Sequence, residues 1–224
     1  WADEDLPNNI FGPMVSRNDP ATPGLDTNYL RYNGVGHVVL GGTDQADVLI
    51  AGIGDDTIWG DGGNDRIEGG NGFDMLNGGD GDDIITDLAF DDNIKGGDGN
   101  DVIHAGEGLD LVIAGRGNDF VNLGAGEGDE VFAGLGDDFI TGEGTIQGFV
   151  GGFGNDWIES AFGIGGLTGD NADVDGSALN FAGEDVNGGH DVLIGGGAPN
   201  DFDSFGGDDI MVSVKKKADA DMRA

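Results

Sequence analysis

Residues 69–86 read Gly-Gly-Asn-Gly-Phe-Asp-Met-Leu-Asn followed by Gly-Gly-Asp-Gly-Asp-Asp-Ile-Ile-Thr, two successive copies of the pattern G-G-x-G-x-D-x-U-x, in which U is a large apolar residue. A further clear copy spans residues 96–104. Working outward, the chain from Gly42 to Glu159 divides into thirteen such nonapeptides with one extra residue, Leu123. A short repeat held at a fixed period is typical of a solenoid, in which each unit is stable only when stacked on its neighbours.

Two positions of the nonapeptide carry nearly the same type of residue in every unit. The sixth position is Asp in twelve of the thirteen units, the exception being Gln147. The eighth position is apolar in all thirteen, namely Leu49, Ile58, Ile67, Leu76, Ile85, Ile94, Ile103, Val112, Val121, Val131, Ile140, Phe149 and Ile158. A disordered acidic chain would not require this spacing.

The two halves of the unit predict different structures. The last three residues suit a short strand whose middle apolar side chain points inward. The first six suit a turn, because glycine allows positive φ and lets backbone carbonyls point into one small space. Two units then make one coil, and the sequence predicts an all-β, right-handed parallel β-roll solenoid with two parallel sheets of short strands.

The stacked turns predict calcium sites. Alternate units place Asp47, Asp65, Asp83, Asp101 and Asp119 along one edge, and Asp56, Asp74, Asp92 and Asp110 along the other. Coils about 4.8 Å apart would bring these carboxylates into repulsive contact without a cation. Carboxylate and carbonyl oxygens are the ligands that Ca²⁺ prefers. We therefore expect a column of Ca²⁺ along each edge.

The composition narrows the class of partner. The 224 residues carry 44 Asp plus Glu against 9 Lys plus Arg, a net charge of −35, which makes nucleic acid and anionic membranes poor partners and cations the natural ones. Cysteine is absent, so neither disulfides nor thiolate sites are expected. We see no membrane-spanning run and no cleavable signal. The chain begins with Trp1, which we interpret as a piece of a longer protein.

These nonapeptides resemble the hemolysin-type, or RTX, calcium-binding repeat, strongly over residues 42–159 and more weakly over 186–212. The resemblance implies ions shared between stacked turns, and export of an unfolded chain that folds outside the cell. The metal ligands that it implies are Asp47, Asp56, Asp65, Gly69, Gly70, Asn71, Gly72, Asp74, Gly78, Gly79, Asp80, Gly81, Asp83, Asp92, Gly96, Gly97, Asp98, Gly99, Asp101, Asp110, Asp119, Asp129, Asp138, Asp156, Asp191 and Asp209. Residues 87–92 have lost their glycines and Gln147 replaces an Asp, so we expect weak or empty sites there.

A narrower resemblance concerns the parent protein. The runs 37–42, 59–65 and 206–212 are similar to the repeat segment of bacterial secreted haem peroxidases of the animal type. The first hypothesis is therefore a calcium-folded extracellular module of such an enzyme. A structural segment of a large calcium-dependent surface adhesin or layer protein is the alternative. An enzyme in its own right is disfavoured, because no convergent nucleophile and base are evident.

The chain divides into five expected parts. They are an irregular N-terminal cap (1–36), the β-roll (37–159), a spacer loop that could pack on the roll (160–186), a second short repeat block (187–212) and a C-terminal tail (213–224). On the outside of one sheet the seventh positions form an apolar stripe of Ile84, Val102, Phe120, Phe139 and Trp157. We expect this stripe either to lie under the spacer or to dock a covalently linked parent domain.

Overall fold

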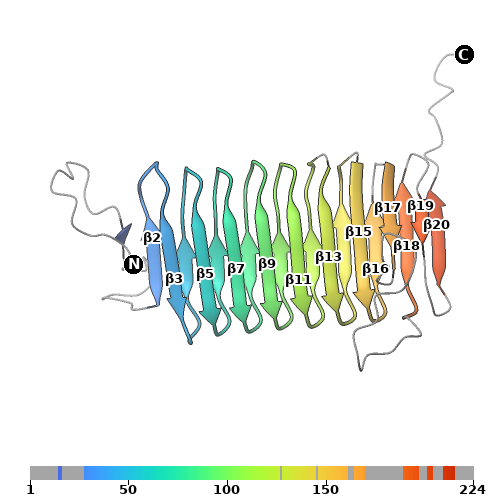
Figure 1. Ribbon diagram of the computed structural model, residues 1–224, viewed down its shortest axis with the longest axis horizontal. Helices are drawn as coiled ribbons and strands as arrows, with labels where there is room; N and C mark the ends of the chain where they lie inside the picture. Colours follow the sequence, from blue (N-terminus) through green and yellow to red (C-terminus); the bar gives the residue numbers. More distant parts are fainter. Residues whose placement is uncertain are drawn as a thin grey trace, which may run out of the picture.

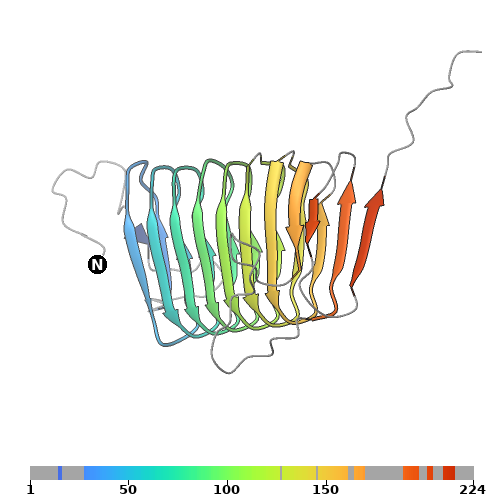
Figure 2. The same ribbon diagram turned by 45° about the vertical axis from the view of Figure 1, so that its right-hand side comes forward.

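The computed structural model describes residues 15–16, 28–126, 128–144, 146–160, 164–169, 189–196, 201–203 and 209–214. These residues form strands and turns stacked along one axis, with the N-terminal strands at one end and the C-terminal strands at the other (Figure 1). A view turned by 45° shows the strands in two layers joined by turns at both edges (Figure 2). The predicted β-roll is confirmed.

Two sheets make the two layers. The eleven-stranded sheet is ordered β1 (Val15–Ser16), β2 (Tyr29–Tyr32), β4 (Val48–Ile50), β6 (Arg66–Glu68), β8 (Ile84–Thr86), β10 (Val102–His104), β12 (Phe120–Asn122), β14 (Phe139–Gly142), β16 (Trp157–Ser160), β18 (Val192–Gly196) and β20 (Ile210–Val214). The nine-stranded sheet is ordered β3 (Val39–Thr43), β5 (Thr57–Gly62), β7 (Met75–Asp80), β9 (Asn93–Asp98), β11 (Leu111–Arg116), β13 (Glu130–Leu135), β15 (Ile146–Phe153), β17 (Ile164–Thr168) and β19 (Asp201–Asp203). Apart from the antiparallel pair β1–β2, every pairing is parallel.

The register follows the repeat. Ile85 pairs with Ile103 and Leu76 with Ile94, so one coil contains two nonapeptides, or 18 residues. The extra residue lengthens one coil, because Val121 pairs with Ile140, 19 residues later. Leu123 is fully buried, so the insertion is accommodated without disturbing the register of the following strands.

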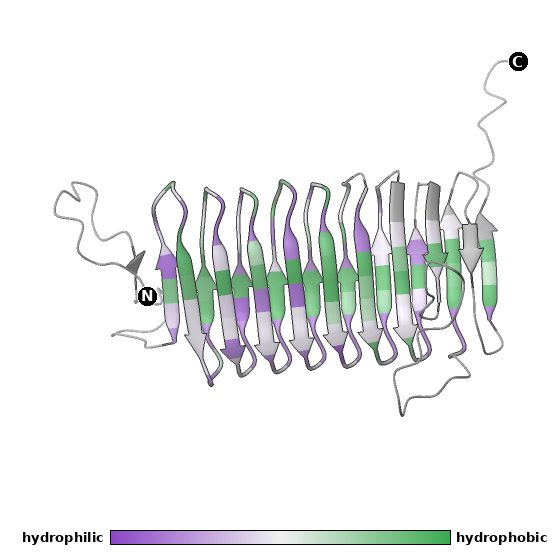
Figure 3. Ribbon diagram, viewed as in Figure 1, coloured by the Kyte–Doolittle hydropathy of each residue, from purple (hydrophilic) through white to green (hydrophobic). Residues whose placement is uncertain are grey.

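The core lies between the sheets and is built from the eighth positions. All thirteen of these apolar side chains are buried, from Leu49 through Ile158, and Leu40, Leu167 and Leu193 extend the same column at its ends. Apolar residues therefore lie across the middle of the strands, while much of one row of turns is hydrophilic (Figure 3). Burying one such side chain contributes about 1.5–3 kcal/mol, and none can be buried within a single coil.

The roll extends beyond the expected boundaries at both ends. Residues 29–32, assigned to an irregular cap, form β2, which pairs with β4. Residues 164–168, assigned to a spacer loop, form β17, which pairs with β15. The second repeat block continues the same stack, because β18 pairs with β16. The described residues leave out the cap at 1–14 and 17–27, most of the spacer (161–163 and 170–186), parts of the second repeat block (187–188, 197–200 and 204–208) and the tail at 215–224.

The outer stripe lies on the eleven-stranded sheet as expected. Phe120 stacks on Phe139 with ring centroids 5.4 Å apart, and Phe139 stacks on Trp157 at 6.3 Å. Ile84, Phe139 and Trp157 remain substantially exposed. Docking of a parent domain on this stripe stays a prediction. Within the described ranges, no helix is long and apolar enough to cross a membrane.

Candidate metal centre

The turns along each edge are joined by a ladder of aspartates. In every rung, the backbone amide of one Asp donates a hydrogen bond to Oδ1 of the Asp one coil further on. The first ladder runs through Asp47, Asp65, Asp83, Asp101, Asp119, Asp138, Asp156, Asp191 and Asp209, with distances of 2.7–3.0 Å. The second ladder runs through Asp56, Asp74, Asp92, Asp110 and Asp129, with distances of 2.7–3.1 Å. The predicted assignment of alternate units to opposite edges is therefore found.

The second oxygen of each carboxylate has a different environment. These Oδ2 atoms are buried and make no hydrogen bond in Asp65, Asp74, Asp83, Asp87, Asp92, Asp101, Asp110, Asp119, Asp138 and Asp156. Burying an anionic oxygen without a partner is costly, so such groups in proteins are paired or bind metal ions. In these residues Oδ1 fixes the side chain within the structure and Oδ2 has no hydrogen-bond partner. At the N-terminal end of the ladders the arrangement differs, because Asp47 Oδ2 accepts the Thr43 amide and hydroxyl and Asp56 Oδ2 accepts the Gly52 amide.

Backbone carbonyls line the space in front of these oxygens. A Cβ added to Gly60 would lie 2.1 Å from Asp65 Oδ2 and 2.2 Å from the carbonyl oxygen of Gly78. A Cβ on Gly78 would likewise lie 2.1 Å from Asp83 Oδ2 and 2.6 Å from the Gly96 carbonyl oxygen. The missing side chain thus leaves a small cradle with oxygens from two coils at distances close to those of Ca–O bonds, about 2.3–2.6 Å. The donor set fits Ca²⁺.

Burial also raises the pKa of the ladder carboxyls. The pKa of Asp101 rises from 3.8 to about 6, mainly through desolvation, although the Asp83 amide partly opposes the rise. Desolvation likewise raises the pKa of Asp83 to about 7 and of Asp156 to about 8, and neighbouring aspartates add to it. Without a cation, several of these groups would therefore be partly protonated near neutral pH.

The glycines of the turns are required by close stacking. Gly97 has φ +130°, and a Cβ there would lie 1.9 Å from the Gly79 carbonyl oxygen one coil earlier. The other predicted ligand glycines with positive φ are Gly70, Gly72, Gly79, Gly81 and Gly99. Their role in the structure is to let turns lie in backbone contact; a role of their carbonyls in metal binding stays a prediction.

Three predicted ligands use their carbonyls in the backbone ladder. The carbonyl oxygens of Asn71, Asp80 and Asp98 accept the amides of Gly54, Gly63 and Gly81. The side chains of Asp80 and Asp98 are exposed, and Asp98 lies 3.6 Å from the Arg116 guanidinium. Asp80 and Asp98 are the last residues of β7 and β9, and a role of these three carbonyls in metal binding stays a prediction.

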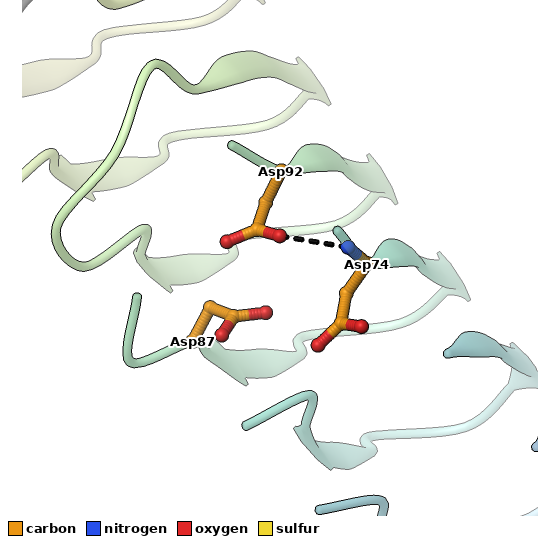
Figure 4. Close-up of side chains that lie close together, drawn as sticks. All are labelled: Asp74, Asp87 and Asp92. Carbon is orange, nitrogen blue, oxygen red and sulfur yellow. Dashed lines mark hydrogen bonds between the residues drawn. The ribbon is translucent and has the colours of Figure 1, made fainter. Parts of the chain in front are cut away.

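Sequence reasoning missed Asp87. Its carboxyl is buried and lies with Asp74 and Asp92, so that one oxygen from each falls within 4.8 Å of the others (Figure 4). Desolvation and the two neighbouring carboxylates raise the pKa of Asp87 to about 9. We expected weak metal binding at this turn only because its glycines are missing. The structure places a third carboxyl group there. The side chain of Gln147, the other departure, lies outside the described residues.

Sequence reasoning also missed a further row of hydrogen bonds, which joins the fifth positions of alternate units. The Asp82 amide donates to Asn64 Oδ1 and the Asn100 amide donates to Asp82 Oδ1, at 3.1 and 2.8 Å. Asn118, Asp137, Asn155 and His190 continue the series on the exposed side of the same edge. The signal was present in the sequence, since the fifth position of alternate units is Asn or Asp in six successive cases from Asn64 to Asn155.

Comparison with known families agrees with this geometry. The family model of the RTX calcium-binding nonapeptide repeat matches residues 41–76, 77–112, 88–121, 96–129 and 123–144, together slightly less than half of the chain. No curated protein and no solved structure matches the chain. RTX repeats bind several Ca²⁺ ions, and the buried aspartate ladders fit such ions. Residues 41–144 are therefore RTX calcium-binding nonapeptide repeats folded as a parallel β-solenoid.

Proposed function

We propose that the chain is a calcium-folded, non-catalytic extracellular module of a larger secreted protein. In this proposal the ladder aspartates, from Asp47 to Asp209 on one edge and from Asp56 to Asp129 on the other, hold the Ca²⁺ ions. The observation that carries the proposal is the row of buried Oδ2 atoms without hydrogen-bond partners.

The physical reason is charge. Each coil brings an aspartate against the aspartate of the next coil, and burial makes ionisation of these groups costly. A divalent cation between them offsets both the desolvation and the repulsion. Because the cradle exists only when turns are stacked, Ca²⁺ binds the folded chain and not the open one, and so stabilises the fold by mass action.

The concentration at which this happens suggests the compartment. Extracellular calcium modules typically bind with dissociation constants of about 10⁻⁴–10⁻³ M, far above cytosolic calcium. A chain with a net charge of −35 would then remain unfolded inside the cell and fold outside it. RTX repeats are typical of secreted bacterial proteins, which supports an extracellular location.

The parent protein is the finer part of the proposal. The resemblance of residues 37–42, 59–65 and 206–212 favours a secreted haem peroxidase, with its haem chemistry outside these residues. A surface adhesin or layer protein is the second candidate, since an aspartate-ladder solenoid can equally act as a rigid spacer. The residues flanking this segment decide between them: a haem-peroxidase domain supports the first and repeated adhesive domains support the second.

The test of calcium folding is a titration of the EDTA-treated chain followed by far-UV circular dichroism. We expect a cooperative rise in β signal with Ca²⁺ at millimolar concentration or below, and no comparable rise with Mg²⁺, which demands a tighter octahedral site. A chain that is fully folded in EDTA at neutral pH would refute the proposal.

A further inference from the structure

Among the described turns of its edge, the turn at residues 87–92 is the one that begins with an aspartate and contains no glycine. Asp87 follows β8 as Gly69 follows β6 and Ala105 follows β10. Ala105 is fully buried at this position, so the position faces the interior of the roll. Asp87 accordingly has only 5% of its surface exposed.

The space for the Asp87 carboxylate comes from the coil before it. A Cβ on Gly69 would lie 2.3 Å from Asp87 Oδ2 and 2.7 Å from Asp74 Oδ2. The glycine therefore leaves a gap that the two carboxylate oxygens share, and any other residue at position 69 would fill it. In Figure 4 the Asp87 carboxylate points from its own turn toward Asp74.

The hydrogen bonds of the three acids fix their orientation and leave one oxygen of each available. Asp74 Oδ1 accepts the Asp56 amide, Asp92 Oδ1 accepts the Asp74 amide, and Asp87 Oδ1 accepts the amides of Leu88 and Gly70. All three Oδ2 atoms are buried without a hydrogen-bond partner. No ion pair found in the described ranges supplies a positive charge to these acids. Three fixed, converging acids without a counter-charge are the arrangement that a divalent cation stabilises.

We propose that Asp74, Asp87 and Asp92 form a three-carboxylate Ca²⁺ site that binds more tightly than the sites of the other described turns, which lack an acid equivalent to Asp87, and that releases its ion last. The inference rests on the proposed calcium-folded function and adds a ligand outside the nonapeptide pattern. Affinity in calcium sites rises with the number of charged ligands and the rigidity of the site. One added charged ligand corresponds to about tenfold or more in affinity.

A tighter site at this turn sets the order in which the coils of the solenoid unfold as the Ca²⁺ concentration falls. Repeat proteins open locally, because each coil contacts only its neighbours. The coils that contain β7 and β9 should therefore stay folded at free Ca²⁺ concentrations that already open distant coils. The same coils would be the nucleus from which the roll grows in both directions as calcium rises.

The experiment is amide hydrogen exchange of the whole chain, measured at neutral pH over a series of buffered free Ca²⁺ concentrations. The tested variant is Asp87→Asn, which preserves the shape of the side chain and an oxygen for the Leu88 and Gly70 amides. The matched control is Asp91→Asn, which removes the same charge from an exposed side chain of the same turn, one whose Oδ1 accepts the Leu109 amide. Asp87→Gly, which restores the residue type found at Gly69, is the second variant should Asp87→Asn fail to fold.

In the wild type and in Asp91→Asn, we expect β7 and β9 to keep protection down to about tenfold lower free Ca²⁺ than β13 and β15. In Asp87→Asn or Asp87→Gly, all four strands should lose protection at the same concentration. Equal Ca²⁺ dependence of these strands in the wild type would overturn the inference while leaving calcium-driven folding intact. Protection that does not depend on Ca²⁺ in any strand would instead refute the proposed function itself.

A proton shared among the three acids is the competing reading, because the pKa of Asp87 is raised to about 9. In that case Asp87→Asn would leave the Ca²⁺ dependence of β7 and β9 unchanged, and this result too would overturn the inference.

Discussion

Replacing Asp101 by Asn should change stability in opposite directions with and without calcium. Asp101 is 1% exposed, its Oδ1 accepts the Asp83 amide at 2.9 Å, and its Oδ2 has no hydrogen-bond partner. The amide oxygen of the replacement can keep the bond to Asp83, so Asp101→Asn removes little besides the negative charge. A variant of this kind separates the structural role of the ladder from its role in binding ions.

The structure sets the size of both effects. Because burial raises the pKa of Asp101 from 3.8 to about 6, ionising it at neutral pH costs the ion-free roll at most about 3 kcal/mol. The variant avoids that cost, so without calcium its free energy of unfolding should rise by about 1–3 kcal/mol. In saturating calcium it loses one charged ligand interaction, worth about 1.5–3 kcal/mol, and should be less stable than the wild type by that amount.

The assay is urea unfolding at neutral pH, followed by circular dichroism at a series of Ca²⁺ concentrations that fold the chain, and the free energy of unfolding without calcium is extrapolated from this series. Asp82→Asn is the control, because Asp82 is exposed and its Oδ1 likewise accepts a backbone amide one coil on, that of Asn100. The control should stay within about 0.5 kcal/mol of the wild type at every calcium concentration. A stabilisation by Asp101→Asn that is as large in saturating calcium as without it would refute the reasoning.

Three other outcomes follow from the same geometry. Because folding raises the pKa of Asp92 and Asp156 from 3.8 to about 8, the stability that these groups give the calcium-free chain is fully present below about pH 4 and is lost progressively as pH rises to about 8; circular dichroism of ion-free protein should show more β structure at pH 5 than at pH 8, and the reverse order would contradict this assignment. Gly97→Ala places a Cβ 1.9 Å from a carbonyl oxygen at φ +130° and should cost at least about 1–3 kcal/mol, whereas Gly41→Ala meets nothing within 4 Å and should change thermal stability little; equal effects would count against close stacking of the turns. Ile103→Ala removes a fully buried eighth-position side chain and should lower the free energy of unfolding in calcium by about 2–5 kcal/mol, so a loss below 1 kcal/mol would argue against a packed core between the sheets.

The sequence predicted most of the fold because the repeat carries the information locally. A fixed period of nine places the eighth residue of each unit, such as Ile85 and Ile103, in the inward core, and it places the sixth residues of alternate units on the same edge. Close stacking then follows from glycine at the turns. The length of the repeat unit was therefore enough to assign each position to the core or to a turn.

The parts that could not be predicted depend on contacts between coils. Asp87 is buried as a potential ligand only because Gly69, one coil earlier, leaves room for it. Strands β2 and β17 pair with the roll although their sequences lack the Asp of the nonapeptide, since an end coil needs only backbone pairing and an apolar inward residue such as Leu167. The contacts within the roll do not identify the parent protein, because the roll is built from its own residues alone.

The location of the ions tests the central claim most directly. A crystal structure of the chain grown in Ca²⁺, with anomalous diffraction to identify calcium, should show a row of ions along each edge, each within about 2.3–2.6 Å of Oδ2 atoms such as those of Asp83 and Asp101. Ordered water in front of these oxygens, with Ca²⁺ present in the crystal but bound elsewhere or nowhere, would contradict the claim that the aspartate ladders are calcium sites.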